Sequence, residues 1–181
     1  MPTQRQIIPW KRFWCPFGKE IHVGEGFLTD PEGEFTGRLY NPHLRTLDQL
    51  LNEKCLILCG DPGSGKSIAL EQAKPGLLNS LGSGGQLMWL EFRDIPNESV
   101  FTRRTFDSET WKNWQVSTGK LRLVVDGVDE GLVKIRNFVS YLATELQARH
   151  TPFERLQVVL VCRSADWPVS EGEQLAGLWG F

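Results

Sequence analysis

The sequence lacks the features that would place the chain in a membrane or mark it for export. It contains no run of about 18 apolar residues, the length that a membrane-spanning helix requires. Its first residues, MPTQRQIIPWKRFW, have neither a long apolar stretch nor a small-residue cleavage site, so they do not resemble a secretory signal. We therefore expect a cytoplasmic protein that does not associate with membranes.

An excess of charge of one sign is also lacking. Lysine and arginine number 20 and aspartate and glutamate 22, which gives a net charge of -2 at pH 7 and a pI near 5.9. This balance provides no general attraction to nucleic acid or to anionic lipid, although it is compatible with a local basic patch. We expect that nucleic acid is not a partner.

Cysteine and histidine are scarce, and their spacing does not suggest a metal site. Cys55 and Cys59 are close enough to resemble a metal pair, but no further cysteine or histidine has ligand spacing. The cysteines that flank or end apolar runs are typical of small buried side chains in a reducing compartment. The remaining residues of these two types are Cys15, Cys162, His22, His43 and His150.

Internal repeats and low-complexity tracts are absent, and 181 residues correspond to about one domain. Residues 1–45 are rich in aromatic, glycine and proline residues, and we expect short strands or an irregular wrap packed on the main domain. Residues 46–181 are expected to form that domain. The aromatic side chains of the first segment are expected to pack in a core, and stacking on an adenine base is the alternative.

After about residue 47, apolar runs alternate with helical patterns. Buried strands are predicted at 55–59 (CLILC), 86–92 (QLMWLEF), 121–126 (LRLVVD) and 156–162 (LQVVLVC). Helices are predicted at 67–74, ended or kinked by Pro75, at 108–116, capped by Ser108, and at 132–149. Apolar strands that alternate with helices predict an α/β fold with a parallel sheet covered by helices on both faces.

The segment 60–67, GDPGSGKS, satisfies the P-loop pattern and lies between a predicted strand and a predicted helix. Glycines at 63 and 65 allow several backbone N–H groups to point at one anion, next to the positive end of a helix dipole. Lys66 would reach the outer phosphates, and the Ser67 hydroxyl would ligate Mg²⁺. The predicted nucleotide-binding residues are Gly60, Asp61, Pro62, Gly63, Ser64, Gly65, Lys66, Ser67 and Ile68.

Acidic residues follow the predicted strand at 121–126. Asp126 is placed to hold Mg²⁺ together with Ser67, and either Asp129 or Glu130 could polarise the attacking water. The alternative is that these two acids are solvated loop residues. Arg163 ends the last predicted strand, and it would lie near the terminal phosphate if that strand neighbours the P-loop strand. The alternative is a surface arginine that pairs with a carboxylate.

The segment LVVDGVDE, with a small residue after the metal-binding Asp126 and the acidic pair later, resembles the NACHT group of signal-transducing P-loop ATPases (STAND proteins). CGDPGSGKS and VCRSADWP are similar to the P-loop and sensor strand of bacterial members. The resemblance covers roughly residues 10–170. It implies an ATP/ADP switch with Mg²⁺ that oligomerises, often in antiviral defence. Members continue into a further strand, a winged helix and a sensor region, so we expect a fragment or a short variant whose core is incomplete after the sensor strand.

Several functions therefore stay open. The first is a NACHT-like ATPase with weak or partner-dependent turnover, which self-associates or uses a partner chain at an unpaired sheet edge. The second is a nucleotide-binding assembly module without turnover. The third is a DNA-associated ATPase, which the acidic net charge disfavours. The absence of an Asn-Lys-x-Asp string favours adenine over guanine only weakly.

Overall fold

A computed structural model describes residues 11–24, 26–33 and 35–180. The chain divides into two compact units, Met1–Leu50 and Leu51–Phe181, which we call the N-terminal and the C-terminal unit. The predicted boundary between residues 45 and 46 lies close to this division. Among the described residues, no helix combines the length and the hydropathy that crossing a membrane requires.

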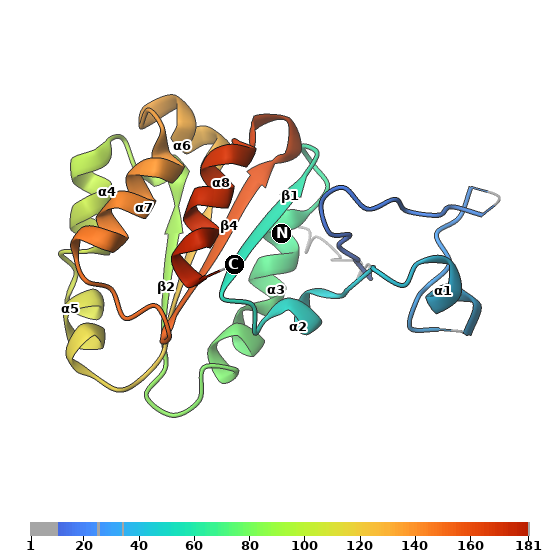
Figure 1. Ribbon diagram of the computed structural model, residues 1–181, viewed down its shortest axis with the longest axis horizontal. Helices are drawn as coiled ribbons and strands as arrows, with labels where there is room; N and C mark the ends of the chain where they lie inside the picture. Colours follow the sequence, from blue (N-terminus) through green and yellow to red (C-terminus); the bar gives the residue numbers. More distant parts are fainter. Residues whose placement is uncertain (1–10, 25, 34, 181) are drawn as a thin grey trace, which may run out of the picture. The chain divides into compact units, whose positions relative to one another are not determined.

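The C-terminal unit alternates strands and helices along the chain (Figure 1). Its strands are β1 (Cys55–Gly60), β2 (Gln86–Glu91), β3 (Leu121–Asp126) and β4 (Leu156–Arg163). Its α-helices are α3 (Lys66–Asn79), α4 (Glu98–Thr105), α5 (Glu109–Val116), α6 (Val128–Lys134), α7 (Phe138–Ala148) and α8 (Val169–Ala176). Short 3₁₀ turns are η1 (Phe92–Asp94), η2 (Ser164–Asp166) and η3 (Gly177–Trp179).

The four strands form one parallel sheet in the order β1-β4-β3-β2. All four were predicted, and each lies within a residue of its expected bounds. The last strand in sequence, β4, is inserted between β1 and β3, so the strand after the P-loop helix lies at the far edge. Because parallel strands point the same way, the carboxyl ends of β1, β4 and β3 lie side by side at one edge of the sheet.

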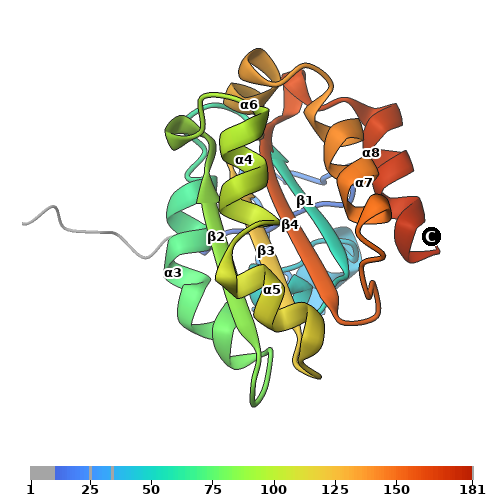
Figure 2. The same ribbon diagram turned by 90° about the vertical axis from the view of Figure 1, so that its left-hand side faces the viewer.

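Side chains of the sheet are buried on both faces, as the sequence predicted. On one face, alternate residues such as Leu123, Val158 and Leu160 join the main core with aromatic residues from the η1 turn and the helices α4, α5 and α7. On the other face, the intervening Val124 and Val159 are buried as well. Helix α3 lies apart from α7 and α8, with the strands between them (Figure 2), and it touches both β1 and β2.

The aromatic core explains the short helices α4 and α5. Asn97 and Ser108 cap them, since each side chain accepts a hydrogen bond from a backbone N–H in the first turn. Trp111 and Trp114, three residues apart on α5, are both buried, with ring centroids 4.9 Å apart. The Ser108 cap and the helix to Val116 are therefore confirmed, whereas α4 was missed.

Helix α3 continues past Pro75 to Asn79, so of the two expected effects of Pro75, an end or a kink, the end does not occur. A proline within a helix removes one backbone hydrogen bond and crowds the preceding turn. The turns on either side of Pro75 are anchored by Leu70 and Leu77, which are fully buried. This packing offsets the local cost of the proline.

The single helix predicted at 132–149 is two helices, α6 and α7. The chain leaves the helix at Ile135, which is extended and buried, and Asn137 has φ 54°. Asparagine is one of the few residues that adopts this left-handed conformation readily. Helix α6 also begins earlier than expected, at Val128, directly after the turn that follows β3.

Arg122 fixes α3 to the sheet at the end opposite the P-loop. Arg122 as a whole is 1% exposed, and its guanidinium donates to the backbone carbonyls of Leu51 and Leu77 and to the side chain of Gln157. It also donates to Ser80 Oγ over 2.9 Å. Burial lowers the pKa of Arg122 to about 10, which leaves the guanidinium protonated at neutral pH.

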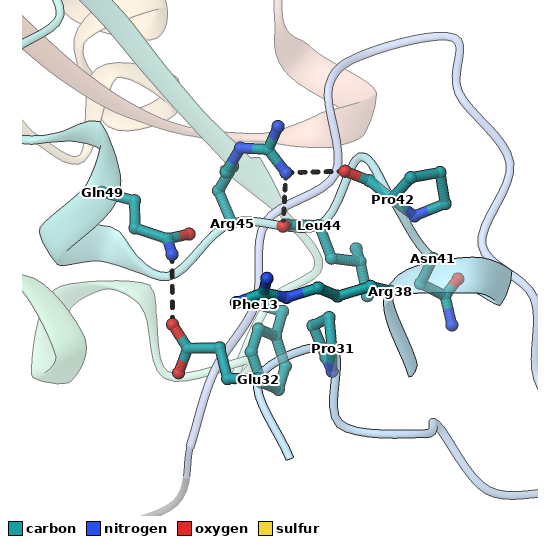
Figure 3. Close-up of a pocket in the computed structure, with 9 residues that line it drawn as sticks. All are labelled: Phe13, Pro31, Glu32, Arg38, Asn41, Pro42, Leu44, Arg45 and Gln49. Carbon is teal, nitrogen blue, oxygen red and sulfur yellow. Dashed lines mark hydrogen bonds between the residues drawn. The ribbon is translucent and has the colours of Figure 1, made fainter. Parts of the chain in front are cut away.

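The described residues of the N-terminal unit form helices α1 (Phe35–Tyr40) and α2 (Leu47–Leu50) and isolated bridges such as Trp14–Arg45. Of the two expected forms, short strands or an irregular chain, they adopt the irregular one. In residues 11–24, 26–33 and 35–50, turns interrupt the chain every few residues, which leaves too little length for a strand. Within this unit is a cavity of about 320 Å³ (Figure 3). Arg45 at its wall donates to the carbonyls of Pro42 and Leu44 over 2.7 and 2.9 Å.

Candidate functional site

The P-loop connects the end of β1 to the start of α3. Gly63 and Gly65 have φ 75° and 80°, so the loop curls through conformations that favour glycine. Ser64 N–H donates to Asp61 O over 3.2 Å, which closes the turn. A Cβ added at Gly60 would lie 3.1 Å from Ser64 Oγ, so the loop folds back closely on the end of β1. The glycines therefore allow a tightly curled loop directly before the helix.

The side chain of Lys66 folds back into this curled loop. Its Nζ donates to Gly60 O over 2.6 Å and to Asp61 O over 2.9 Å, and it lies 3.4 Å from Ser64 Oγ. The ammonium thus lies inside the curve of the loop, half-buried, and its partners in the described part of the chain are neutral oxygens. An anion held by the loop would meet this charge directly, because the lysine needs only to exchange carbonyl acceptors for phosphate oxygens.

Ser67 and Ile68 follow in the first turn of α3, and both are exposed. The hydroxyl of Ser67 therefore lies at the positive end of the helix, beside the loop. Ile68 is 53% exposed, which is unusual for an isoleucine in the first turn of a packed helix. Its side chain is available for contact with a bound molecule.

The carboxyl ends of the neighbouring strands bring the remaining predicted residues to the same edge of the sheet. Arg163 on β4 is in register with Gly60, the first residue of the P-loop, which fulfils the condition on which its predicted role rested. Asp126 ends β3, and its strand position is in phase with Val124, so both side chains lie on the face that does not carry the main aromatic core. Gly60, Arg163 and Asp126 thus end three adjacent strands.

Asp129 and Glu130 lie in the first turn of α6 and have different environments. Asp129 Oδ2 accepts a hydrogen bond from Arg163 Nε over 2.8 Å and has a side chain that is 12% exposed. Glu130 is exposed, and in the described part of the chain no hydrogen bond or ion pair joins its carboxylate to another residue. Its carboxyl carbon lies 3.8 Å from the position of a Cβ added at Gly127, so it folds back toward the end of β3.

Glu91 is a residue of this edge that the sequence did not single out. It ends β2 in register with Asp126, and it forms an ion pair with Arg93. The signal was present, because the predicted strand QLMWLEF carries its only charge directly before its last residue. It was missed because register between β2 and β3 is a property of the folded sheet.

The cysteines near the site are packing groups. Cys59 and Cys162 are in register on β1 and β4, directly before Gly60 and Arg163. Burial raises the pKa of the Cys162 thiol to about 12, with the carboxylate of Asp129 adding to the effect. Burial also raises the pKa of Cys59, which the charge of Lys66 partly opposes. Both thiols are therefore protonated at neutral pH, and they pack in the main core or against it.

The residues present fit a nucleotide and its magnesium ion. Donors for phosphate oxygens come from the glycine-rich loop, from the ammonium of Lys66 inside it and from the start of α3. The described residues contain no group of three or more acidic, histidine or cysteine side chains arranged for a metal. Magnesium at nucleotide sites is held by one or two protein oxygens together with phosphates, and Ser67 and Asp126 supply such oxygens.

Topology and motif together define the fold. A P-loop after an edge strand, a neighbouring strand that ends in Arg163 and a third that ends in Asp126 make up a P-loop NTPase fold of the α/β class. The cavity of the N-terminal unit contains none of the predicted site residues. The site therefore rests on the loop and strand ends of the C-terminal unit.

No family model matches the chain, and no curated protein matches it. Among solved structures, the chain is similar to the crystal structure of Cdc6p from Pyrobaculum aerophilum, with a TM-score of 0.49 and 14% sequence identity. The similarity covers 84% of this chain and 46% of that chain, so the match spans about half of that protein's length. A likeness at this identity concerns the fold alone.

Proposed function

We propose that the chain binds Mg-ATP through the loop at 60–67 and hydrolyses it as a switch module of the NACHT type. The observation that carries the proposal is the curled P-loop, in which the ammonium of Lys66 lies 2.6 Å from Gly60 O. Beside it, two strands end in groups suited to the same chemistry, a carboxylate at Asp126 and a guanidinium at Arg163.

Each residue has a distinct role in this proposal. Backbone N–H groups of the loop and the ammonium of Lys66 bind the outer phosphates, and Arg163 approaches from the adjacent strand. Ser67 and Asp126 would hold Mg²⁺, which would neutralise charge that develops on the phosphates. Glu130, which is exposed and free of any side-chain partner in the described structure, orients the attacking water and accepts its proton.

The NACHT assignment is supported by the spacing of the acids around the turn after β3. Gly127 has φ 76°, so a residue with a side chain would be strained there. This turn places Asp129 and Glu130 at the start of α6, where negative charge is favoured by the helix dipole. The small residue after Asp126 and the later acidic pair thus have a structural reason, and they are the features that the NACHT group shares.

Phosphate release tests the proposal. We expect release from Mg-ATP that scales with the amount of protein, and a loss of about 10²–10³-fold in Lys66→Ala, the size typical of removing one preorganised donor to the reacting group. Glu130→Gln should bind Mg-ATP like the wild type and turn it over at least about tenfold more slowly. The matched control is Lys112→Ala, which removes an exposed lysine that pairs with Glu109 of its own helix.

The outcomes separate the candidate functions. Phosphate release that persists in Lys66→Ala would show that the activity does not belong to this loop, and would refute the proposal. Binding of Mg-ATP without release in the wild type would replace the ATPase with a nucleotide-binding assembly module. Equal release by Glu130→Gln and the wild type would remove Glu130 from the reaction.

A further inference from the structure

The guanidinium of Arg163 forms an ion pair with Asp129 in the structure. Its Nε donates to Asp129 Oδ2 over 2.8 Å, and the side chain of Asp129 is only 12% exposed, whereas that of Arg163 is 49% exposed. The buried partner of this ion pair is thus the carboxylate. Because Asp129 lies in the first turn of α6 and Arg163 ends β4, the pair joins the segment after β3 to the strand beside the P-loop.

The position of Arg163 gives this contact a consequence for phosphate binding. Arg163 is in register with Gly60, so its side chain starts from the strand position adjacent to the first residue of the P-loop. A guanidinium there would attract a third phosphate. While the guanidinium is paired with Asp129, its charge is largely neutralised, and the carboxylate itself repels further negative charge.

We propose that the Asp129–Arg163 ion pair is a gate for the third phosphate, which makes the ligand-free site bind nucleoside diphosphate in preference to triphosphate. This inference rests on the proposed nucleotide site. Binding of the triphosphate requires Arg163 to exchange the carboxylate of Asp129 for a phosphate oxygen. The diphosphate does not reach Arg163, and it binds through the loop and Lys66 alone.

The gate also implies different roles for the two acidic residues, Asp129 and Glu130. Asp129 is a positioning residue that sets where Arg163 points, because its carboxylate is held and mostly buried. Glu130 has no such partner in the described part of the chain and is left to orient water. The acidic pair, which looks equivalent in the sequence, therefore consists of one residue for selectivity and one for turnover.

The test compares the Kd values of ATP and ADP in a catalytically slow background, Glu130→Gln, by calorimetry in the presence of Mg²⁺. Asp129→Asn keeps the shape of the side chain and removes its charge. It should raise the affinity for ATP about fivefold, the size expected for releasing one partly exposed ion pair, and change that for ADP less than about twofold. Arg163→Met should remove the gain when combined with Asp129→Asn, which a double-mutant cycle measures.

The matched control is Asp107→Asn. Asp107 lies between α4 and α5, and its carboxylate is 4.0 Å from Arg149, which follows α7. This substitution also removes an aspartate beside an arginine, but away from the P-loop, so both Kd values should stay as in the background protein. A general effect of net charge would move them together with those of Asp129→Asn.

Two results would overturn the gate. An unchanged ratio of the ATP and ADP affinities in Asp129→Asn would show that the ion pair does not govern the third phosphate. A gain in ATP affinity that persists with Arg163→Met would show that Asp129 acts by repulsion alone. Failure of the proposed function is distinguishable from both, because it would abolish binding of ATP and ADP alike in the background protein and leave no ratio to compare.

Discussion

Replacing Arg122 with methionine should destabilise the fold strongly while leaving the P-loop residues untouched. Arg122 is buried at the end of the sheet opposite the P-loop. Its guanidinium holds the carbonyl of Leu77 in α3, the carbonyl of Leu51 before β1, and the side-chain oxygen of Gln157 on β4. One cation thus links the P-loop helix, the start of the P-loop strand and the central strands.

The expected loss in the free energy of unfolding follows from the hydrogen-bond acceptors that the substitution would leave without a donor. Methionine fills much of the volume but donates nothing, so the oxygens of Leu51, Leu77 and Gln157 lose their charged donor. A buried acceptor without a partner costs about 1–3 kcal/mol. Relief from burying the guanidinium, whose pKa is lowered by that burial, offsets part of this cost. We expect a net loss of about 3 kcal/mol in the free energy of unfolding, a large share of a domain's stability.

Urea denaturation followed by tryptophan fluorescence measures this loss, because Trp111 and Trp114 report on the main core. The midpoint should fall, and the dependence of stability on urea should not change. The control is Arg103→Met on the exposed face of α4, which should alter stability by less than about 0.5 kcal/mol. A loss below about 1 kcal/mol in Arg122→Met would refute the reasoning, since it would mean that water or rearrangement satisfies the stranded acceptors.

Four further substitutions have definite expected outcomes. Asp126→Ala should remove most of the difference in ATP affinity between excess Mg²⁺ and EDTA in a binding titration, and a retained difference would exclude Asp126 as a magnesium ligand. Gly131→Ala should lower stability by about 1–3 kcal/mol in urea denaturation, because its Cβ would lie 2.5 Å from ring atoms of Phe92. In contrast, Gly76→Ala, whose Cβ would meet only an ordinary contact at 3.6 Å, should raise stability by about 0.5–1 kcal/mol. Pro75→Ala should raise the thermal midpoint, because it restores a hydrogen bond within α3 at an exposed position, and an unchanged or lower midpoint would contradict this.

The strands were predictable because their sequences combine uninterrupted apolar residues with clear ends. CLILC, LRLVVD and LQVVLVC have no alternative that buries as many branched side chains, and the structure has strands at all three. The break between α6 and α7 was hidden because Ile135, Phe138 and Val139 keep helical spacing across it. Only packing shows that Ile135 reaches the core from an extended backbone, with Asn137 providing the left-handed turn.

The part of the candidate site that is continuous in sequence, the loop at 60–67, was predictable. The contacts between residues at the ends of different strands were not. The loop at 60–67 is a local motif, and its glycines adopt the positive φ angles that a tight curl needs. Strand order is a long-range property, and the insertion of β4 between β1 and β3 is what places Arg163 next to the P-loop. The same arrangement pairs Arg163 with Asp129, whereas the sequence indicated only that Arg163 could pair with some carboxylate.

Calorimetric titration of Mg-ATP and Mg-ADP into the wild type and Lys66→Ala is the most direct test of nucleotide binding at this loop. We expect the wild type to bind both nucleotides, and Lys66→Ala, with an unchanged circular dichroism spectrum, to lose at least about tenfold in affinity for each. Equal affinities in the two proteins, or no binding by a folded wild type, would contradict the assignment of the loop at 60–67 as a nucleotide site.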